Sequence, residues 1–236
     1  MSDKPKGPPF KPKRLYGRRK GHPLSDYQAG LIDALMPKLA VNVDGPVDLA
    51  DLFDSPGPLR LEIGFGGGEH LCHRAAALPD WNFIGVEPFE NGMAKCLAGV
   101  DRNGLKNVRL LMDDARFLLD QLPTASVDHI DLLYPDPWPK LRHNKRRFVN
   151  QGNLDEIARV LKPGGKFCFA SDIPSYVDWT LDHLRRHPGF AWQASSAADW
   201  RTPYDGWLST RYEQKAIREG RTPHYLTFVR IDQLGD

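Results

Sequence analysis

A carboxylate flanked by prolines and followed by cations is the part of this sequence best suited to chemistry. Asp136 lies in the turn Pro-Asp-Pro-Trp-Pro at residues 135–139, directly after a mainly apolar run at 127–134. The run is typical of a buried strand, so the prolines would hold the carboxylate in a rigid turn where that strand ends. Five cations follow the turn at once: Lys140, Arg142, Lys145, Arg146 and Arg147. A fixed carboxylate beside this positive charge indicates an enzyme whose ligand carries phosphates, as a nucleic acid does.

A glycine-rich segment follows the first expected strand, residues 59–63. Glu62 stands just before its glycines, which are Gly64, Gly66, Gly67 and Gly68. Without Cβ atoms, these residues let the backbone turn tightly and approach a ligand closely. The next expected strand ends at Glu87, where a carboxylate can accept hydrogen bonds from both hydroxyls of a ribose. The two segments predict a nucleoside cofactor at the carboxyl ends of the strands.

Two classes of cofactor fit this layout. A dinucleotide usually requires the pattern G-x-G-x-x-G and a helix N-terminus for its pyrophosphate, whereas residues 62–68 read as an acid followed by G-x-G-x-G. S-adenosylmethionine has no phosphate, and an acid beside a glycine loop can help to hold its amino-acid end. A third strand-end carboxylate, Asp114, could reach an adenine amino group. Any one of these acids could simply cap a helix, but acids at four successive strand ends favour a cofactor site.

Strands and helices alternate regularly from residue 59 onward. Strands are expected at 59–63, 81–86, 108–112, 128–133, 166–170, 190–193 and 224–231, and helices at about 69–78, 90–103, 115–122, 145–161, 175–187 and 209–219. The apolar patterns that define them change period between strand and helix. This alternation predicts a doubly wound α/β fold, with a mostly parallel seven-stranded sheet and helices on both faces.

The N-terminal region differs in composition from the rest of the chain. Its first 20 residues are rich in lysine, arginine and proline and hold one acid, Asp3. Residues 1–22 are therefore expected to form a disordered basic arm, which either keeps the chain soluble or docks on phosphates. Ser25 and Gln28 have the spacing of a capping box at the start of an amphipathic helix. We expect one domain at 23–236, with residues 23–55 as its helical extension.

Composition excludes several other classes. No apolar run is long enough to span a bilayer and no signal-peptide pattern is present, so we expect a cytoplasmic protein without a membrane partner. Cys72, Cys96 and Cys168 form no CxxC pair and are expected to be free thiols. His70 and His73 lie near Cys72, but the spacing fits no common zinc pattern. We expect these three side chains on a solvated helix face, and no metal.

Taken together, these motifs resemble the bacterial tRNA (guanine-N7-)-methyltransferase family, which belongs to the class I S-adenosylmethionine-dependent methyltransferases. The resemblance covers roughly residues 25–231 and rests on five segments: residues 62–66 (Glu-Ile-Gly-Phe-Gly), 135–140, 142–147, 171–172 (Ser-Asp) and 210–213 (Thr-Arg-Tyr-Glu). It implies an antiparallel last strand in the sheet. It also implies methyl transfer from S-adenosylmethionine to N7 of a guanosine in the variable loop of tRNA.

The resemblance implies a role for each matching residue, with Asp136 as the central active-site acid. Cofactor contacts would come from Glu62, Gly64, Gly66, Gly68, Glu87, Asp114 and Asp136. Substrate contacts would come from Lys140, Asp172, Thr210, Arg211, Tyr212 and Glu213. Contacts with tRNA would come from Arg142, His143, Asn144, Lys145, Arg146 and Arg147.

The expected reaction requires little acid–base chemistry. Guanine N7 carries a lone pair and no proton, so no general base is needed and catalysis would come mainly from positioning. A carboxylate, from Asp136 or Asp172, would accept hydrogen bonds from guanine N1–H and N2–H₂ and offset the positive charge that grows on the ring. Acceptance from these two groups would also select guanine over adenine.

Several alternatives stay open at the level of sequence. Asp172 could cap the helix that starts near residue 175, residues 210–213 could be an ordinary helix cap, and Trp138 is more readily explained as packing than as stacking on a base. The chain could be a methyltransferase of the same fold for a protein or small molecule, a non-catalytic RNA-binding module, or a dinucleotide oxidoreductase. Both a monomer and a homodimer are compatible with the sequence.

Overall fold

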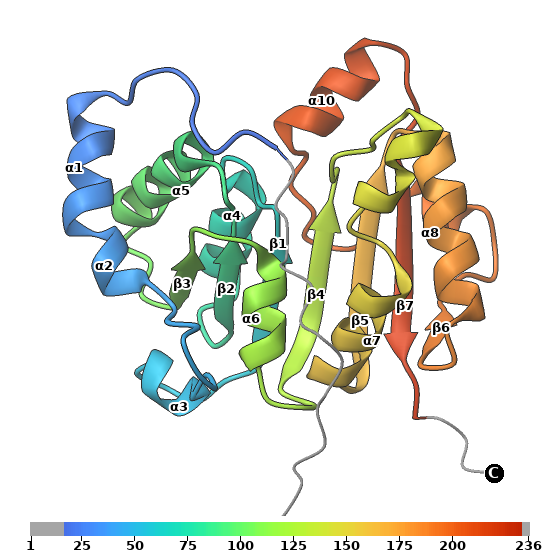
Figure 1. Ribbon diagram of the computed structural model, residues 1–236, viewed down its shortest axis with the longest axis horizontal. Helices are drawn as coiled ribbons and strands as arrows, with labels where there is room; N and C mark the ends of the chain where they lie inside the picture. Colours follow the sequence, from blue (N-terminus) through green and yellow to red (C-terminus); the bar gives the residue numbers. More distant parts are fainter. Residues whose placement is uncertain (1–16, 233–236) are drawn as a thin grey trace, which may run out of the picture.

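A seven-stranded sheet crosses the whole molecule in a computed structural model that describes residues 17–232 (Figure 1). Its strand order is β3-β2-β1-β4-β5-β7-β6. The neighbouring pairs among the first five strands are parallel, and β7 is antiparallel to both β5 and β6. The strands are β1 Leu59–Ile63, β2 Asn82–Val86, β3 Val108–Leu111, β4 Val127–Leu133, β5 Leu161–Ser171, β6 Phe190–Trp192 and β7 His224–Arg230. The predicted fold class, including the antiparallel last strand, is confirmed.

Helices cover both faces of the sheet because strands buried on both sides need two apolar layers. The helices are α1 Asp26–Ala34, α2 Met36–Leu39, α3 Leu49–Leu52, α4 Glu69–Ala77, α5 Glu90–Asn103, α6 Ala115–Gln121, α7 Gln151–Val160, α8 Pro174–Arg186, α9 Ala198–Arg201 and α10 Arg211–Arg218, with a 3-10 helix, η1, at Leu141–Arg146. One apolar cluster holds side chains of α6, α7 and α8, and a second holds side chains of α1, α2, α4 and α5. No helix of residues 17–232 is long and apolar enough to cross a membrane.

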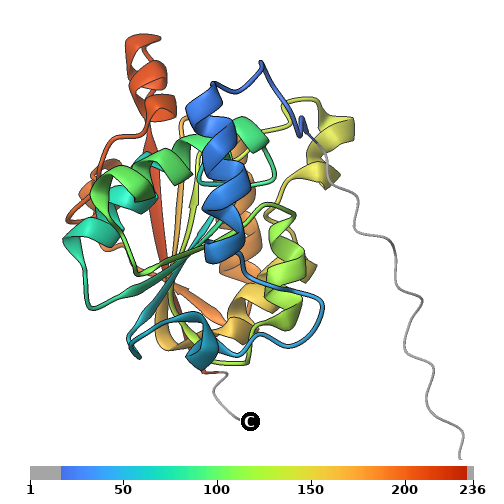
Figure 2. The same cartoon turned by 90° about the vertical axis from the view of Figure 1, so that its left-hand side faces the viewer.

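The helical extension begins as the capping pattern predicts. The Ser25 hydroxyl accepts a hydrogen bond from the Gln28 amide at 3.3 Å, and the Gln28 side chain accepts one from the Ser25 amide at 3.3 Å. From there α1 packs against α5 and crosses it (Figure 2). The chain therefore returns to the edge of the sheet before the first strand begins.

Residues 17–22, which we expected to belong to a disordered arm, have defined contacts. The Arg19 carbonyl accepts a hydrogen bond from the Glu90 amide at 2.9 Å. The Asn91 side chain accepts one from the Gly21 amide and donates one to the His22 carbonyl, each at 2.7 Å. The start of α5 thus supplies polar partners that composition alone did not reveal. The rest of the expected arm, residues 1–16, lies outside the described residues.

The helix expected at 145–161 is wrong in its first part. Residues 141–146 form η1, and α7 begins only at Gln151. Arg147 has an extended backbone, and the Asn150 side chain accepts a hydrogen bond from the Asn153 amide at 3.2 Å, which caps α7. The cations after the Pro-Asp-Pro turn therefore precede the α-helix.

Residues 163–165, which separate the expected helix at 145–161 from the expected strand at 166–170, lie within β5. The pairing of β4 with β5 jumps from Val127–Leu161 to His129–Lys166. The extra residues are accommodated as a bulge, and the left-handed backbone of Gly164 (φ 78°) fits such a site.

Candidate functional site

A cavity of about 620 Å³ opens at the carboxyl ends of β1, β2 and β4. Of the residues predicted from sequence to act in the site, those in its wall are Gly64, Gly66, Glu87, Asp114, Asp136, Lys145, Arg146, Arg147, Arg211 and Tyr212. The strand ends thus converge as the parallel topology requires. Within the described chain, the wall does not include Glu62, Gly68, Lys140, Arg142, His143, Asn144, Asp172, Thr210 or Glu213.

The glycine loop between β1 and α4 depends on its lack of side chains. Gly64, Gly66 and Gly68 have left-handed backbones, with φ values of 71°, 61° and 76°. A Cβ atom on Gly66 would lie 3.3 Å from Tyr212 Cε2. A Cβ atom on Gly68 would lie 2.6 Å from Cys96 Sγ, so Gly68 serves the packing of α4 on α5. The loop leaves room for a ligand between β1 and α10.

Glu87, at the end of β2, binds the glycine loop directly. Its carboxylate accepts hydrogen bonds from the Gly66 amide at 2.8 Å and from the Phe89 amide at 3.0 Å. Burial raises the pKa of Glu87, and these two amides oppose the shift. A carboxylate has further lone pairs, so Glu87 can shape the loop and still accept hydrogen bonds from ligand hydroxyls.

Asp114 both caps α6 and lies in the cavity wall. It accepts a hydrogen bond from the Arg116 amide at 3.0 Å and pairs with the Arg116 guanidinium at 2.5 Å. The capping alternative is therefore true of Asp114, but it does not exclude a ligand contact. Arg116 itself also lies in the wall.

Asp136 projects from a turn with unusual backbone geometry. Tyr134 and Trp138, on either side of it, have φ values of 51° and 44°, which non-glycine residues rarely adopt. The Tyr134 amide donates to the Ala170 carbonyl at 2.8 Å, which ties the turn to β5. Loss of hydration raises the pKa of Asp136. Such strain in a turn at a cavity is common at functional sites.

Trp138 does more than pack beneath the turn. Its ring is half-buried in the cavity wall, and the Arg146 guanidinium lies over it at 4.9 Å from the centroid. His143 meets the ring edge-on at 6.0 Å between centroids. The aromatic ring thus supports two side chains of the cationic segment.

Arg147 differs from the exposed cations predicted to contact tRNA, because it is buried, with 3% of its surface exposed. Its guanidinium donates to the Pro137 carbonyl at 2.9 Å and to the Ser175 carbonyl at 3.0 Å. By contrast, Lys140, Arg142 and Lys145 are exposed. The structure therefore gives Arg147 the position of a strut between the Pro-Asp-Pro turn and α8. The spacing of cations in the sequence could not reveal this difference.

Asp172 lies in a separate groove, away from Asp136. It forms an ion pair with Arg221, and the groove also contains Arg201 and His224. The residue at the cap position of α8 is Ile173, with no side-chain hydrogen bond, so Asp172 is not the cap of that helix. The two carboxylates considered for guanine recognition are thus in different surroundings.

The segment 210–213 divides into supporting and cavity-lining residues. The Thr210 hydroxyl accepts a hydrogen bond from the Glu213 amide at 3.2 Å and caps α10. Glu213 is buried and accepts hydrogen bonds from the Trp207 indole, at 2.8 Å, and from the Tyr225 hydroxyl. Arg211 and Tyr212 lie in the cavity wall. The capping alternative is correct for Thr210.

The expected solvated face around His70 is wrong. His70 and Cys72 are buried, with 1% and 7% of their surfaces exposed, and of the three side chains only that of His73 is exposed. The three cysteines are free thiols, as predicted. His70 binds Glu62, which is buried beneath the glycine loop. Sequence reasoning missed this polar cluster, although charged residues within the strands at 59–63 and 127–133 were a signal for it.

Two groups of side chains in this cluster have metal-like composition: His129, Asp131 and Cys168, and Glu62, His70 and Asp131. Arg60 pairs with Asp131 at 2.6 Å and supplies positive charge at the centre of both groups. Hydrogen bonds account for these side chains without an ion, since a guanidinium already neutralises the shared carboxylate.

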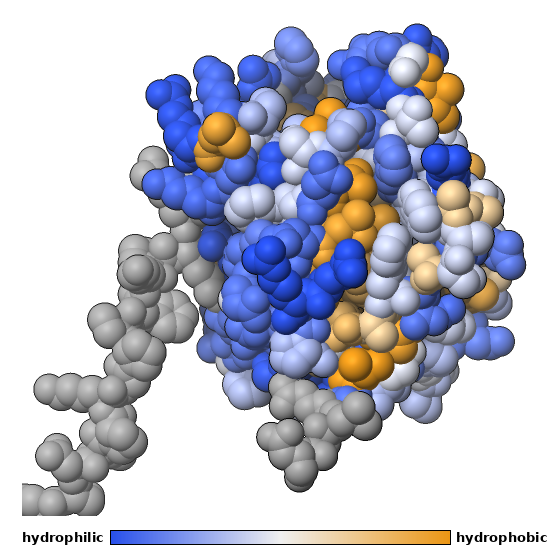
Figure 3. All heavy atoms as spheres, turned by 90° about the vertical axis from the view of Figure 1, so that its right-hand side faces the viewer, coloured by the Kyte–Doolittle hydropathy of each residue, from blue (hydrophilic) through white to orange (hydrophobic). Residues whose placement is uncertain are grey.

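The cavity therefore fits a nucleoside that carries a charged tail. Its volume falls in the usual range for small-molecule sites, its loop has no side chains, and a carboxylate lies at the end of β2. β4 points towards the upper end of the molecule (Figure 1), and hydrophilic side chains lie at that end as well as over the middle of the face in Figure 3. A polar macromolecule could approach the cavity from that end.

The chain as a whole is similar to known methyltransferases. The family described as "Putative methyltransferase" matches residues 56–226. Curated proteins named tRNA (guanine-N(7)-)-methyltransferase, from Agrobacterium fabrum and Rhizobium meliloti, are each 60% identical over 219 residues, which are 92% of this chain and 94% of each relative. The solved 16S rRNA methyltransferase KamB shares the fold, with a TM-score of 0.54 and 19% identity over 76% of this chain and 89% of that chain.

Proposed function

The chain belongs to the tRNA (guanine-N(7)-)-methyltransferase family, and on that premise we propose that it transfers a methyl group from S-adenosylmethionine to N7 of a guanine in tRNA. The observation that carries the proposal is the meeting of Gly66, Glu87 and Asp136 in one cavity. We further propose the variable-loop guanosine at position 46 as the target and the cytoplasm, where tRNA is modified, as the location.

The cofactor, when bound, supplies an electrophilic methyl group on sulfur. Gly64 and Gly66 would let its amino-acid end approach the backbone, and Glu87 would accept hydrogen bonds from its ribose. Asp114, at the end of β3, would receive the adenine amino group. All four of these residues line the cavity.

For guanine recognition we propose Asp136 rather than Asp172. Asp136 lies in the cavity wall, whereas Asp172 is paired with Arg221 in a separate groove. The Asp136 carboxylate would accept hydrogen bonds from guanine N1–H and N2–H₂ and stabilise the positive charge that develops on the ring. Because N7 carries no proton, the main task of the site is to hold the base in line with the methyl group.

For tRNA binding we propose the exposed cations around η1. Lys140, Arg142 and Lys145 are exposed beside the cavity, and Arg146 lies over Trp138. Such side chains bind phosphates without regard to base sequence, so they would position the RNA and leave base selection to the cavity. A substrate contact by Asp172 would be made beside its ion pair with Arg221.

The experiment that tests this function maps the product. The purified chain is incubated with methyl-labelled S-adenosylmethionine and unmodified tRNA, and the labelled nucleoside is identified by mass spectrometry and located in the tRNA. We expect label on N7 of one guanosine in the variable loop. Cofactor binding without transfer to tRNA would favour a non-catalytic RNA-binding module, and label on protein or a small molecule would favour another methyltransferase.

A further inference from the structure

A buried polar network lies directly beneath the glycine loop. The proposed methyl transfer assigns no role to it. Its members are Arg60 and Glu62 on β1, His70 on α4, His129 and Asp131 on β4, and Tyr204 between α9 and α10. The first five have at most 8% of their surfaces exposed. Burial of so many charged groups is costly unless each is paired, so their arrangement requires an explanation.

The hydrogen bonds assign a charge to His70. The Tyr204 hydroxyl donates to Asp131 Oδ1 at 3.0 Å and accepts from Arg60 Nη2 at 2.6 Å, so it has no second proton for its contact with His70 Nε2 at 2.8 Å. Nε2 must therefore donate. Nδ1 lies 2.8 Å from Glu62 Oε2. Burial raises the pKa of Glu62 and the contact with His70 opposes this shift, and with Glu62 ionised its carboxylate can only accept. His70 is thus an imidazolium.

With this assignment the buried charges balance. Arg60 and His70 are positive, Glu62 and Asp131 are negative, and a neutral His129 donates its Nε2 proton to Asp131 at 3.0 Å. Burial lowers the pKa of His129, which agrees with a neutral ring. Burial alone would lower the pKa of His70 as well, but the Glu62 carboxylate outweighs it and raises that pKa.

The pair of Glu62 and His70 closes the base of the glycine loop. Glu62 lies in β1 just before the loop, and His70 is the second residue of α4 just after it. Their hydrogen bond therefore joins the two ends of the segment that contains Gly64 and Gly66, both in the cavity wall. Loss of this bond would let β1 and α4 move relative to each other at the loop.

Tyr204 extends the network to the other wall of the cavity. The segment around it is held by Arg74, which donates to the Gly206 carbonyl at 2.9 Å, and by Trp207, whose ring lies 5.3 Å from that of His70. Trp207 donates to Glu213 on α10 at 2.8 Å. The next links along α10 are Arg211 and Tyr212, which face the glycine loop across the cavity.

We infer that His70 is a positioning residue, which through Glu62 and Tyr204 clamps the glycine loop and α10 to one buried network and so sets the width of the cofactor cavity. The inference rests on the proposed function, because it concerns the same cavity. His70 is not among the residues of the cavity wall. Its effect reaches the ligand through the two segments that it joins.

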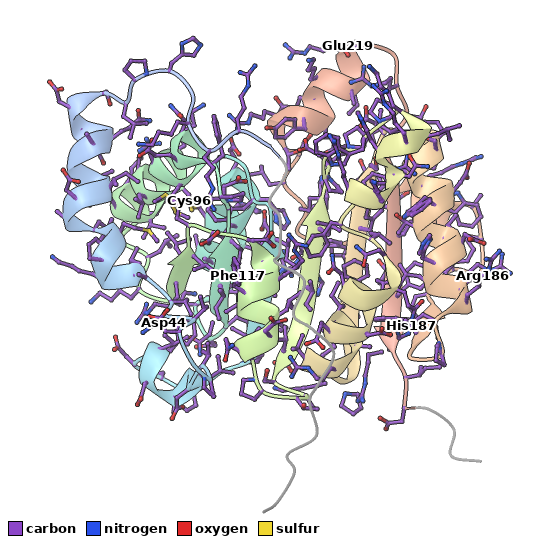
Figure 4. All side chains as sticks on the ribbon, viewed as in Figure 1. Asp44, Cys96, Phe117, Arg186, His187 and Glu219 are labelled. Carbon is purple, nitrogen blue, oxygen red and sulfur yellow. The ribbon has the colours of Figure 1, made fainter. Side chains whose placement is uncertain are left out.

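The test compares two variants of the network with a matched control. His70→Gln cannot bridge Glu62 and Tyr204 as an imidazolium does, and Tyr204→Phe keeps the ring but removes the hydroxyl that joins His70, Arg60 and Asp131. His187→Gln is the control, because His187 is also buried and contacts a carboxylate, Asp155, at 3.1 Å. His187 lies towards the opposite end of the sheet from the cavity (Figure 4).

We expect both network variants to raise the dissociation constant of S-adenosylmethionine about tenfold, since each leaves a buried polar group without its partner. The KM for the cofactor should rise in parallel, with kcat at saturation changed by less than about twofold, because uniform binding is weakened. His187→Gln should lower the melting temperature but leave the dissociation constant unchanged. Calorimetric titration, steady-state kinetics and thermal unfolding provide these three readouts.

The pH dependence separates positioning from general destabilisation. Because the folded-state pKa of His70 is raised, its contribution is present below the ordinary histidine value and is lost as pH rises through the folded-state pKa. The ratio of dissociation constants for His70→Gln and the parent chain should therefore approach one at high pH. The titratable and charged groups that surround His70 are Arg60, Glu62, Arg74, His129, Asp131, Cys168 and Tyr204.

The outcomes are distinguishable from those of the proposed function. If the parent chain methylates tRNA and both network variants bind the cofactor as it does at every pH, the clamp is overturned while the function stands. If the parent chain binds the cofactor, the variants bind it weakly and tRNA is never methylated, the clamp stands and the function fails. Should His70→Gln not fold, Tyr204→Phe alone decides between these results.

Discussion

Asp136 is held ready for its proposed role before any ligand arrives. Tyr134 is bonded to β5 on one side of the turn, and Arg147 holds the Pro137 carbonyl on the other. The left-handed backbones of Tyr134 and Trp138 cost about 1–2 kcal/mol each, and these contacts offset part of that cost. A carboxylate that is fixed in advance loses little entropy when it accepts hydrogen bonds from guanine, which is how positioning lowers the barrier.

Replacement of this carboxylate by an amide tests the role directly. Asp136→Asn should lower kcat about 100-fold, the scale seen when a group that stabilises transition-state charge is removed. The amide keeps the shape of the side chain, so the dissociation constant of S-adenosylmethionine should change little. Single-turnover methyl transfer and calorimetric titration measure the two quantities. Asp44→Asn, an exposed change at the far end of the molecule (Figure 4), should alter neither, and full activity of Asp136→Asn would contradict the charge-stabilising role.

The pH dependence of the reaction gives a second test of Asp136. Loss of hydration raises its pKa above the ordinary aspartate value. Because the carboxylate form is the active one, kcat/KM, which reports the free enzyme, should rise with pH through this raised pKa and then level off. The free energy of unfolding changes in the opposite direction. Because the folded-state pKa of Asp136 is raised, its ionisation destabilises the fold as pH rises from the unfolded-state pKa to the folded-state pKa. Asp136→Asn should therefore remove the limb from the pH–rate profile without lowering the melting temperature at neutral pH.

At the scale of elements, the cationic segment is the part of the chain where local pattern and tertiary structure differ most. Arg147 is placed by contacts with Pro137 and Ser175, far from it in sequence, and its guanidinium lies over Tyr176 at 4.9 Å from the ring centroid. Its neighbours Arg142 and Lys145 stay exposed on η1. One run of basic residues thus contains a strut and a binding surface.

A pair of single substitutions separates these two roles. Arg147→Ala should lower the free energy of unfolding by about 2–3 kcal/mol, because the Pro137 and Ser175 carbonyls lose the charged donor of a buried side chain. Arg142→Ala should change it by less than about 0.5 kcal/mol, as is usual for an exposed side chain. Urea denaturation of both variants provides the comparison. Equal stability of the two variants would show that the buried contacts of Arg147 contribute nothing to the fold.

Much of the fold could be predicted from the sequence because its signals are local. The strand at 59–63 alternates apolar and charged residues and is followed by glycines, and the capping box at Ser25 is complete within four residues. The expected strand ends in turn predicted Gly66, Glu87 and Asp136 at one edge of the sheet, because the carboxyl ends of parallel strands lie at the same edge.

The rest depended on contacts between residues distant in sequence. His70 is buried because Glu62 and Tyr204 bind it, and Tyr204 lies 134 positions away. Arg221 forms an ion pair with Asp172, which lies 49 positions before it in the sequence. No periodicity records such pairs, and a charged residue in a strand shows only that some partner must exist. The predicted start of α7 was wrong for a simpler reason. Asn150 caps the helix, but an asparagine is equally typical of a loop, so the sequence did not mark it as the cap.

At the scale of the whole molecule, charge is distributed unevenly although its sum is small. The net charge is only +2, yet Lys140, Arg142 and Lys145 are exposed together beside the cavity. Association with RNA depends on such local concentration of charge and on salt, and only weakly on the net charge. The strand ends, the cavity and these cations all lie towards one end of the sheet, so substrate and cofactor can meet there without any rearrangement of the core.

This asymmetry predicts how salt acts on tRNA binding. In the double variant Arg142→Ala/Lys145→Ala, the slope of the logarithm of the binding constant against the logarithm of salt concentration should flatten by about 0.7–0.9 for each phosphate that the variant no longer neutralises. Arg185→Ala/Arg186→Ala removes the same charge from the exposed end of α8, away from the cavity (Figure 4). If net charge governed binding, both double variants would flatten the slope equally in filter-binding titrations. We expect only the first to do so, because counterions are released only where cations touch the RNA.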